Sequence, residues 1–341
     1  MITMEGTVDT APTLTFSDMG LPPVTKQPVN TPFGKIQSCK DLTKLEVTFL
    51  FLMLISIITA TGFTINRLST VEKGHPDITF GILLLVNAVF SVWFLLEGIF
   101  RERPSEILIL TIAIDTVMVY LICNFAMGTQ NEIKLARLVI ACISAPVLTV
   151  IGLGFIARKY FLSKHLIFRT VGASSDLQAT YRNLLYFEDG LKLDFQLGIS
   201  LVVLVMDGKE IETHEIIILI LGVLVKLTWF ILGHTMFWRE LKVGAYIFWA
   251  LSPIEIGYII FKIYDVTLYF SDAKGLATAT IVCIIGAIIA RVLVIIGSAF
   301  VYKGFGKGLK EKSQVLLPGE QKLKKETNES TIEASNVNSS A

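Results

Sequence analysis

Eight long apolar runs dominate this chain, and each is about 18 to 27 residues long. A helix rises about 1.5 Å per residue, so a run of this length crosses the roughly 30 Å hydrocarbon core of a bilayer. The pattern predicts an all-α integral membrane protein with eight transmembrane helices. The expected spans are 47–65, 79–100, 107–127, 138–157, 186–206, 216–233, 243–264 and 276–302.

The composition indicates that much of the surface faces lipid. Hydrophobic residues make up 53% of the 341, and the mean hydropathy is +0.65, more apolar than a soluble domain of this size could hide. The first forty residues are polar and have no apolar centre, so no signal peptide is expected and the first span acts as its own anchor.

Basic residues collect on alternate connections, which predicts the orientation. The two tails and the even-numbered connections carry 21 Lys and Arg, whereas the opposite loops carry six. Because positive residues stay on the cytoplasmic side, both termini are expected to be cytoplasmic. The membrane itself, plasma membrane or endomembrane, is left open.

The spans and their connections divide the chain into five expected parts: a disordered cytoplasmic N-tail (1–43), a first four-helix half (44–157), a cytoplasmic amphipathic linker (158–185), a second four-helix half (186–302) and a disordered cytoplasmic C-tail (303–341). In the linker, Ser175 and Gln178 have the spacing of a capping box, which predicts a helix start. That helix either lies along the inner leaflet or continues into the fifth span, with Gly190 as a bend.

Two pairs of similar segments suggest that the halves are parallel repeats. The segment 41–46 at the foot of the first span and the segment 189–194 at the foot of the fifth both read D-x-x-K-L-acid. The segments 151–156 and 296–301, near the ends of the fourth and eighth spans, also match, at a similar offset. Many transporters are built from repeats with their sites where the halves meet; chance similarity is the alternative.

Four charged residues fall near the centres of predicted spans, namely Asp115, Lys226, Glu255 and Arg291. Each costs roughly 2.5 to 3.5 kcal/mol to insert, so they should face the interior and find partners. We expect Glu255 to pair with Arg291 on the next helix, and Asp115 to pair with Lys226 across the halves. The four either line an ion, proton or solute pathway or form static pairs that fix helix register.

Pro253 lies two residues before Glu255 and is a candidate hinge. Its missing N–H leaves the carbonyl of Trp249 without a helical partner, and broken helices beside carboxylates are common in transporter sites. Pro146 in the fourth span could act in the same way, although such kinks usually only shape packing.

Motifs for catalysis and cofactor binding are missing from the sequence. It has no phosphate-binding glycine loop, no Gly-x-Ser-x-Gly and no His pair with metal-ligand spacing, so we expect no enzyme, no metal, no cofactor and no nucleic-acid partner. Cys123 and Cys142 flank one short loop, which leaves a disulfide between them or two free thiols as alternatives.

The stretch 168–205 contains Arg169-Thr170-Val171-Gly172, Tyr181 and Leu191-Lys192-Leu193-Asp194-Phe195. It resembles a pattern in an uncharacterised family of eukaryotic multipass membrane proteins. The resemblance covers little more than a tenth of the chain and implies the fold class without implying an activity.

Two functions fit these observations. The first is a small-solute or ion transporter or channel, with a polar path between the two halves lined by the four central charges. The second is a noncatalytic membrane sensor or scaffold that recruits partners through its linker and tail. The expected partners are the lipid bilayer and a small solute or ion, and a homo-oligomer is left open.

Overall fold

A computed structural model describes residues 29–31, 34–71, 77–127, 132–163, 167, 174–204, 213–269 and 274–307. The expected tails before residue 29 and after residue 307, and most of the linker between 164 and 173, lie outside these residues. The long helices are α1 (Lys44–Thr70), α2 (Asp77–Phe100), α3 (Pro104–Met127), α4 (Glu132–Thr149), α7 (Ser175–Val203), α8 (Thr213–Trp238), α9 (Lys242–Tyr269) and α10 (Lys274–Lys303). The π-helix η2 (Val150–Ala157) and α5 (Arg158–Ser163) continue α4 without a break.

Part of the expected N-tail is structured. Strands β1 (Val29–Thr31) and β2 (Gly34–Ile36) form an antiparallel hairpin, followed by the short 3-10 helix η1 (Cys39–Asp41). The backbone N–H of Gln37 donates to the carbonyl of Phe100 at 2.7 Å, which fixes the segment to the end of α2. Strands of three residues are too short to show the alternation of apolar and polar residues by which a sequence predicts a strand.

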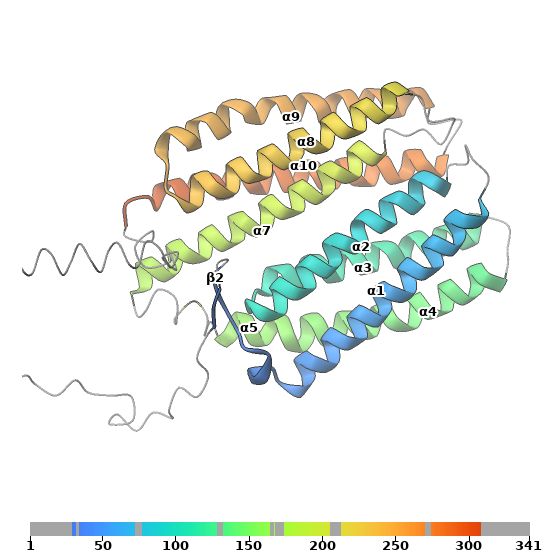
Figure 1. The fold of residues 1–341 in the computed structure, drawn as a ribbon, viewed down its shortest axis with the longest axis horizontal. Helices are drawn as coiled ribbons and strands as arrows, with labels where there is room; N and C mark the ends of the chain where they lie inside the picture. Colours follow the sequence, from blue (N-terminus) through green and yellow to red (C-terminus); the bar gives the residue numbers. More distant parts are fainter. Residues whose placement is uncertain are drawn as a thin grey trace, which may run out of the picture.

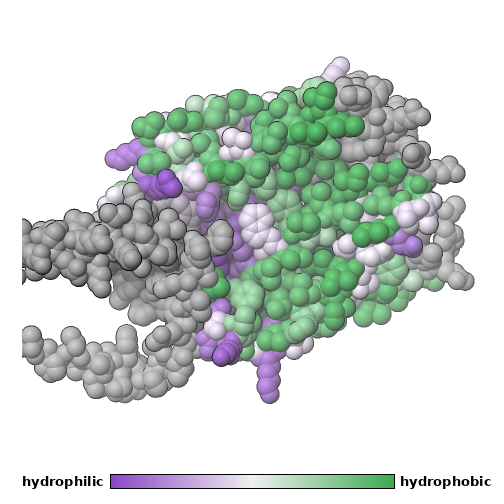
Figure 2. All heavy atoms as spheres, in the orientation of Figure 1, coloured by the Kyte–Doolittle hydropathy of each residue, from purple (hydrophilic) through white to green (hydrophobic). Residues whose placement is uncertain are grey.

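In the described part of the chain, six helices are long and apolar enough to cross a membrane, fewer than the eight expected. They cover Lys44–Thr70, Ile78–Phe100, Leu138–Leu162, Leu219–Trp238, Lys242–Tyr264 and Ala277–Lys303. Their outward faces are apolar, with Ile58 67% and Val89 70% exposed. Figure 2 shows this apolar surface covering most of the visible length of the bundle, as a lipid-facing surface requires.

The helices run alongside one another in two groups (Figure 1). In each group, α1 to α4 and α7 to α10, every helix packs on the next along the chain, and α7 joins the groups by also contacting α2 and α3. The hairpin, the α2–α3 turn, the start of α7 and the end of α10 all lie at one end of the bundle. We call this the basic end, because it carries the connections that the charge count assigned to the cytoplasm.

Helix α7 is continuous from Ser175 to Val203, so the expected linker helix and the expected fifth span are one element. Its cap residue is Ser174 rather than Ser175, and its first turns pack inward through Tyr181, Leu184 and Phe187. Gly190 does not break the helix; it faces Val294 of α10. Of the two alternatives for the linker helix, continuation into the fifth span is therefore the one that the structure shows.

Candidate functional site

The four helices α7 to α10 each contribute one charged side chain to a buried cluster. The carboxylate of Glu255 (α9) accepts from Lys226 (α8) at 2.8 Å and forms an ion pair with Arg291 (α10). Arg291 also donates to Asp194 (α7) at 2.7 Å. We call Asp194, Lys226, Glu255 and Arg291 the quartet; its two acids and two bases balance, and all four residues are buried.

Small residues on α7 and α10 make room for the quartet. A Cβ added to Gly198 would lie 2.6 Å from Nζ of Lys226, so only glycine leaves the space that the lysine occupies. On α10, Gly286 and the fully buried Ala290 bring this helix close to α7. The guanidinium of Arg291 lies 5.1 Å from the ring centre of Trp229, a cation–π contact that further holds it in place.

The quartet keeps hydrogen-bonding capacity that the described residues do not use. Oε1 of Glu255 and both Nε and Nη1 of Arg291 are buried without a hydrogen-bond partner among those residues. Buried charged groups are normally fully bonded, because each unmade bond costs about 1 to 3 kcal/mol or more. The cluster therefore has free donors and a free acceptor at the same place, which suits water or a small polar solute.

The structure places the four sequence-predicted charges differently from the expected arrangement. It brings Glu255 and Arg291 together, and Lys226 joins them, but Asp115 is elsewhere: its carboxylate accepts from Thr149 of α4 at 3.0 Å. The expected pairing of Asp115 with Lys226 is wrong, because α3 faces α4 in the first group while α8 faces α7 and α9 in the second. The second acid of the cluster is instead Asp194, which pairs with Arg291.

The candidate hinge at Pro253 lies inside an unbroken α9. The fourth span is interrupted near its proline: the helix changes to the wider π form four residues after Pro146. Cys142 carries a free thiol among the described residues. The side chain of Cys123, its possible disulfide partner, lies outside them.

A second group of charges at the basic end was not expected as a unit. Arg103, in the α2–α3 turn, donates to Glu106 at 3.1 Å, to Glu188 at 2.8 Å and to Asp189 at 2.9 Å. Lys192, 1% exposed, donates to Glu106 at 2.6 Å and to Glu97. Together with Arg101, these residues are the basic-end network, which joins α7 to α2 and α3.

Electrostatics in the basic-end network stabilise the charged form of Arg103. Burial alone would lower the pKa of Arg103, but the carboxylates of Glu188 and Asp189 outweigh it and raise that pKa well above its usual range.

The polar contact between α2 and α7 continues inward from this network. Nε2 of Gln196 donates to Oδ1 of Asn87 at 2.6 Å, and Asn87 also reaches Ser200 at 3.5 Å. Amides that bond across helices are common in membrane-helix packing. In the described part of the chain, no group of three or more His, Cys, Asp or Glu side chains could hold a metal ion.

Comparison with protein families finds a match to a domain of unknown function, DUF7789, over residues 33–157 and 171–300. The chain belongs to this family. The DUF7789 match extends over most of the helices, far beyond the local resemblance seen around residues 168–205, and it agrees with the expectation of an uncharacterised family. Comparison with curated proteins yields no match, and comparison with solved structures yields none either.

Proposed function

We propose that this protein moves a small polar solute or ion across a membrane, with the quartet as its binding site. The observation that carries the proposal is a neutral cluster of four buried charges with unused donors and an unused acceptor. Charged side chains at membrane depth are expensive and by default mark substrate or ion pathways. Moving a solute across a membrane requires no catalytic residue.

The proposal includes eight crossings, with α3 and α7 added to the six apolar helices. Both run alongside the others in Figure 1. The polar residues of α7 face α2, α3 and α10 rather than lipid, so its composition does not prevent it from crossing. An even number of crossings places both termini on one side, which we assign to the cytoplasm from the basic residues at that end.

Two parallel repeats of four helices are part of the same proposal. The two stretches matched by the family support this division, because each contains four of the long helices. The site then lies within the second repeat rather than between the two, since the quartet comes from α7 to α10 alone.

Exchange of partners within the quartet gives a mechanism for binding and release. Glu255 is shared by Lys226 and Arg291, so a solute with a positive group can replace one of them. A solute with a negative group can use the free Nε and Nη1 of Arg291. Either event changes which helices are joined by ion pairs, and this links occupancy of the site to the packing of α8, α9 and α10.

Flux measurements on purified protein in liposomes test the proposal. Dyes for H⁺, Na⁺ and Cl⁻, and radiolabelled amino acids, give the readouts. Glu255→Gln and Arg291→Gln should each lower flux at least about tenfold, since a lost charge-assisted contact costs roughly 1.5 to 3 kcal/mol. Asp176→Asn, an exposed acid at the start of α7, is the control and should match the parent. Undiminished flux in both quartet variants contradicts the proposal.

A further inference from the structure

A hollow at the basic end lies beside the network and was not foreseen from the sequence. It has a volume of about 40 Å³, is partly open, and lies between the α2–α3 turn, α5 and α7. Its walls include three arginines, Arg101, Arg103 and Arg182, and the aromatic rings of Tyr181 and Tyr186. Two or three water-sized groups fit this volume, which is the size of a phosphate reaching in by its oxygens.

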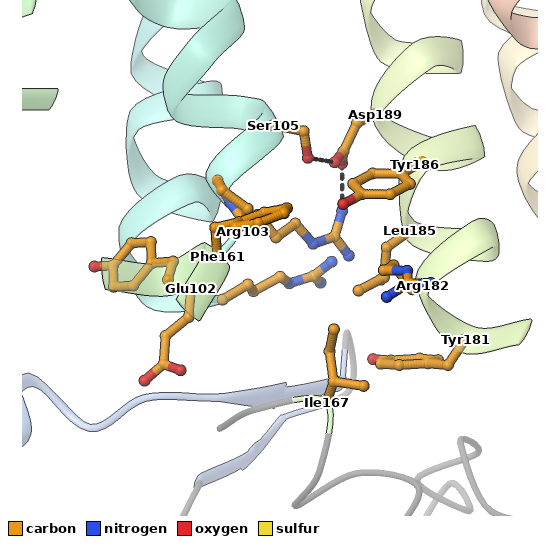
Figure 3. A pocket seen from close by; sticks show the side chains of 13 residues that line it. Glu102, Arg103, Ser105, Phe161, Ile167, Tyr181, Arg182, Leu185, Tyr186 and Asp189 are labelled. Carbon is orange, nitrogen blue, oxygen red and sulfur yellow. Dashed lines mark hydrogen bonds and ion pairs between the residues drawn. The ribbon is translucent and has the colours of Figure 1, made fainter. Parts of the chain in front are cut away.

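Arg182 is the unexplained side chain of this hollow. Arg103 is held by three carboxylates, but among the described residues Arg182 has no carboxylate within ion-pairing distance. It extends from α7 toward the hollow, on the side opposite Arg103 (Figure 3). Guanidinium groups that face each other across a gap repel unless an anion lies between them.

The acidic residues of the hollow do not supply that anion. Asp189 is already bonded to Arg103 at 2.9 Å and accepts from Ser105. The carboxylate of Glu102 points away from the other labelled side chains in Figure 3. The open position between the arginines therefore suits an external anion, and a phosphate matches the fork geometry of guanidinium groups.

The position of the hollow favours a lipid as the source of the phosphate. Phe161, 57% exposed, and Tyr186, 43% exposed, both line it and belong to the outward face of α5 and α7. An apolar outer rim beside a basic hollow at the end of the spans corresponds to the headgroup level of a bilayer, where aromatic residues are enriched. An acyl chain can lie against these rings while the phosphate reaches the arginines.

We propose that this hollow binds the phosphate monoester headgroup of an anionic phospholipid of the adjacent leaflet, with Arg182 as the principal contact. Arg101 and Arg103 form the opposite wall. This site is separate from the quartet, and the proposal does not depend on transport.

Titration of the purified full-length protein in a neutral detergent with short-chain phosphatidic acid, followed by native mass spectrometry, tests the site. Arg182→Gln should weaken binding about tenfold, because it removes a charge-assisted, forked contact. Arg158→Gln is the matched control: Arg158 is exposed on α5 at the same end and does not line the hollow, so binding should stay within about twofold. Phosphatidylcholine with the same chains should bind far more weakly.

Three results would contradict the proposal. Unchanged binding in Arg182→Gln excludes this arginine, and equal losses in both variants indicate nonspecific surface attraction. Inorganic phosphate that binds as tightly as phosphatidic acid would assign the site to a soluble anion instead. Arg182→Lys, which keeps the charge but loses the fork, should give an intermediate loss, and the unfolding midpoint of every variant shows whether it is folded.

Discussion

The two similar segments at the start of α1 and in the middle of α7 occupy very different surroundings. Both read D-x-x-K-L-acid, but Lys44 of α1 is exposed whereas Lys192 of α7 is 1% exposed. The acid of the first, Glu46, accepts from the backbone N–H of Thr43 at 2.7 Å and so caps its own helix, and its other oxygen accepts at 2.9 Å from Lys159 of α5, a lysine that is 43% exposed. The acid of the second, Asp194, pairs with Arg291 on another helix.

The same contrast holds between the two helix groups. Among the described residues, Asp115 in the first has a single hydroxyl partner, whereas Glu255 in the second is held by two cations. Helix α1 faces outward along much of its length, while α7 has neighbours in both groups. The number of helices that surround a segment, more than its sequence, therefore decides whether its charges become a site.

Neutralising the two matched lysines should give the largest difference. Lys192→Met removes one of the cations that hold Glu97 and the buried Glu106, leaving these acids to Arg101 and Arg103 alone, and should cost about 3 kcal/mol of unfolding free energy. Lys44→Met, at an exposed site, should stay within about 0.5 kcal/mol. Unfolding of the purified protein in mixed detergent measures both, and equal effects would remove the distinction between α1 and α7.

Adding one methyl group beside the quartet should have an intermediate effect. Gly198→Ala forces Lys226 to move away from Glu255 and should lower the unfolding free energy by about 1 to 3 kcal/mol, together with flux. Gly257→Ala is the control, because a Cβ there meets nothing within 4 Å, and helix propensity predicts a gain of roughly 0.5 to 1 kcal/mol. Thermal midpoints and liposome flux give the comparison; a harmless Gly198→Ala would contradict the close packing of α7 on α8.

The smallest effect is expected at Asp115. Asp115→Asn keeps an acceptor for Thr149, so the unfolding free energy should change by less than about 1 kcal/mol and flux should remain. The readout is the same flux assay used for Glu255→Gln. Loss of flux in Asp115→Asn would instead place the first helix group in the pathway and restore a route that uses both halves.

The sequence predicted the helices and part of the quartet for simple physical reasons. Apolar length identifies a membrane helix, and a charge at the centre of a span must find a partner, which is why Lys226, Glu255 and Arg291 were found. Asp194 was missed as a partner, although it lies near the middle of the expected fifth span, 186–206, and that position was the available signal.

The basic-end network could not be assembled from the sequence. Its members span residues 97 to 192, and no periodicity indicates that the α2–α3 turn meets the middle of α7. Glu97 and Arg101, by contrast, are one helical turn apart and pair at 3.6 Å. Local spacing reveals partners one helical turn apart, whereas partners from distant helices depend on how the bundle packs.

The polar composition of α7 also has a consequence for biogenesis. In the proposed arrangement of eight crossings, helices enter the bilayer in the order of synthesis, so α7 emerges before Arg291, the partner of Asp194, has been made. The acids that hold Lys192 from α2 and α3 are already in place by then. We therefore expect α7 to be retained beside the nascent first group and to settle fully only when the last helix, α10, arrives.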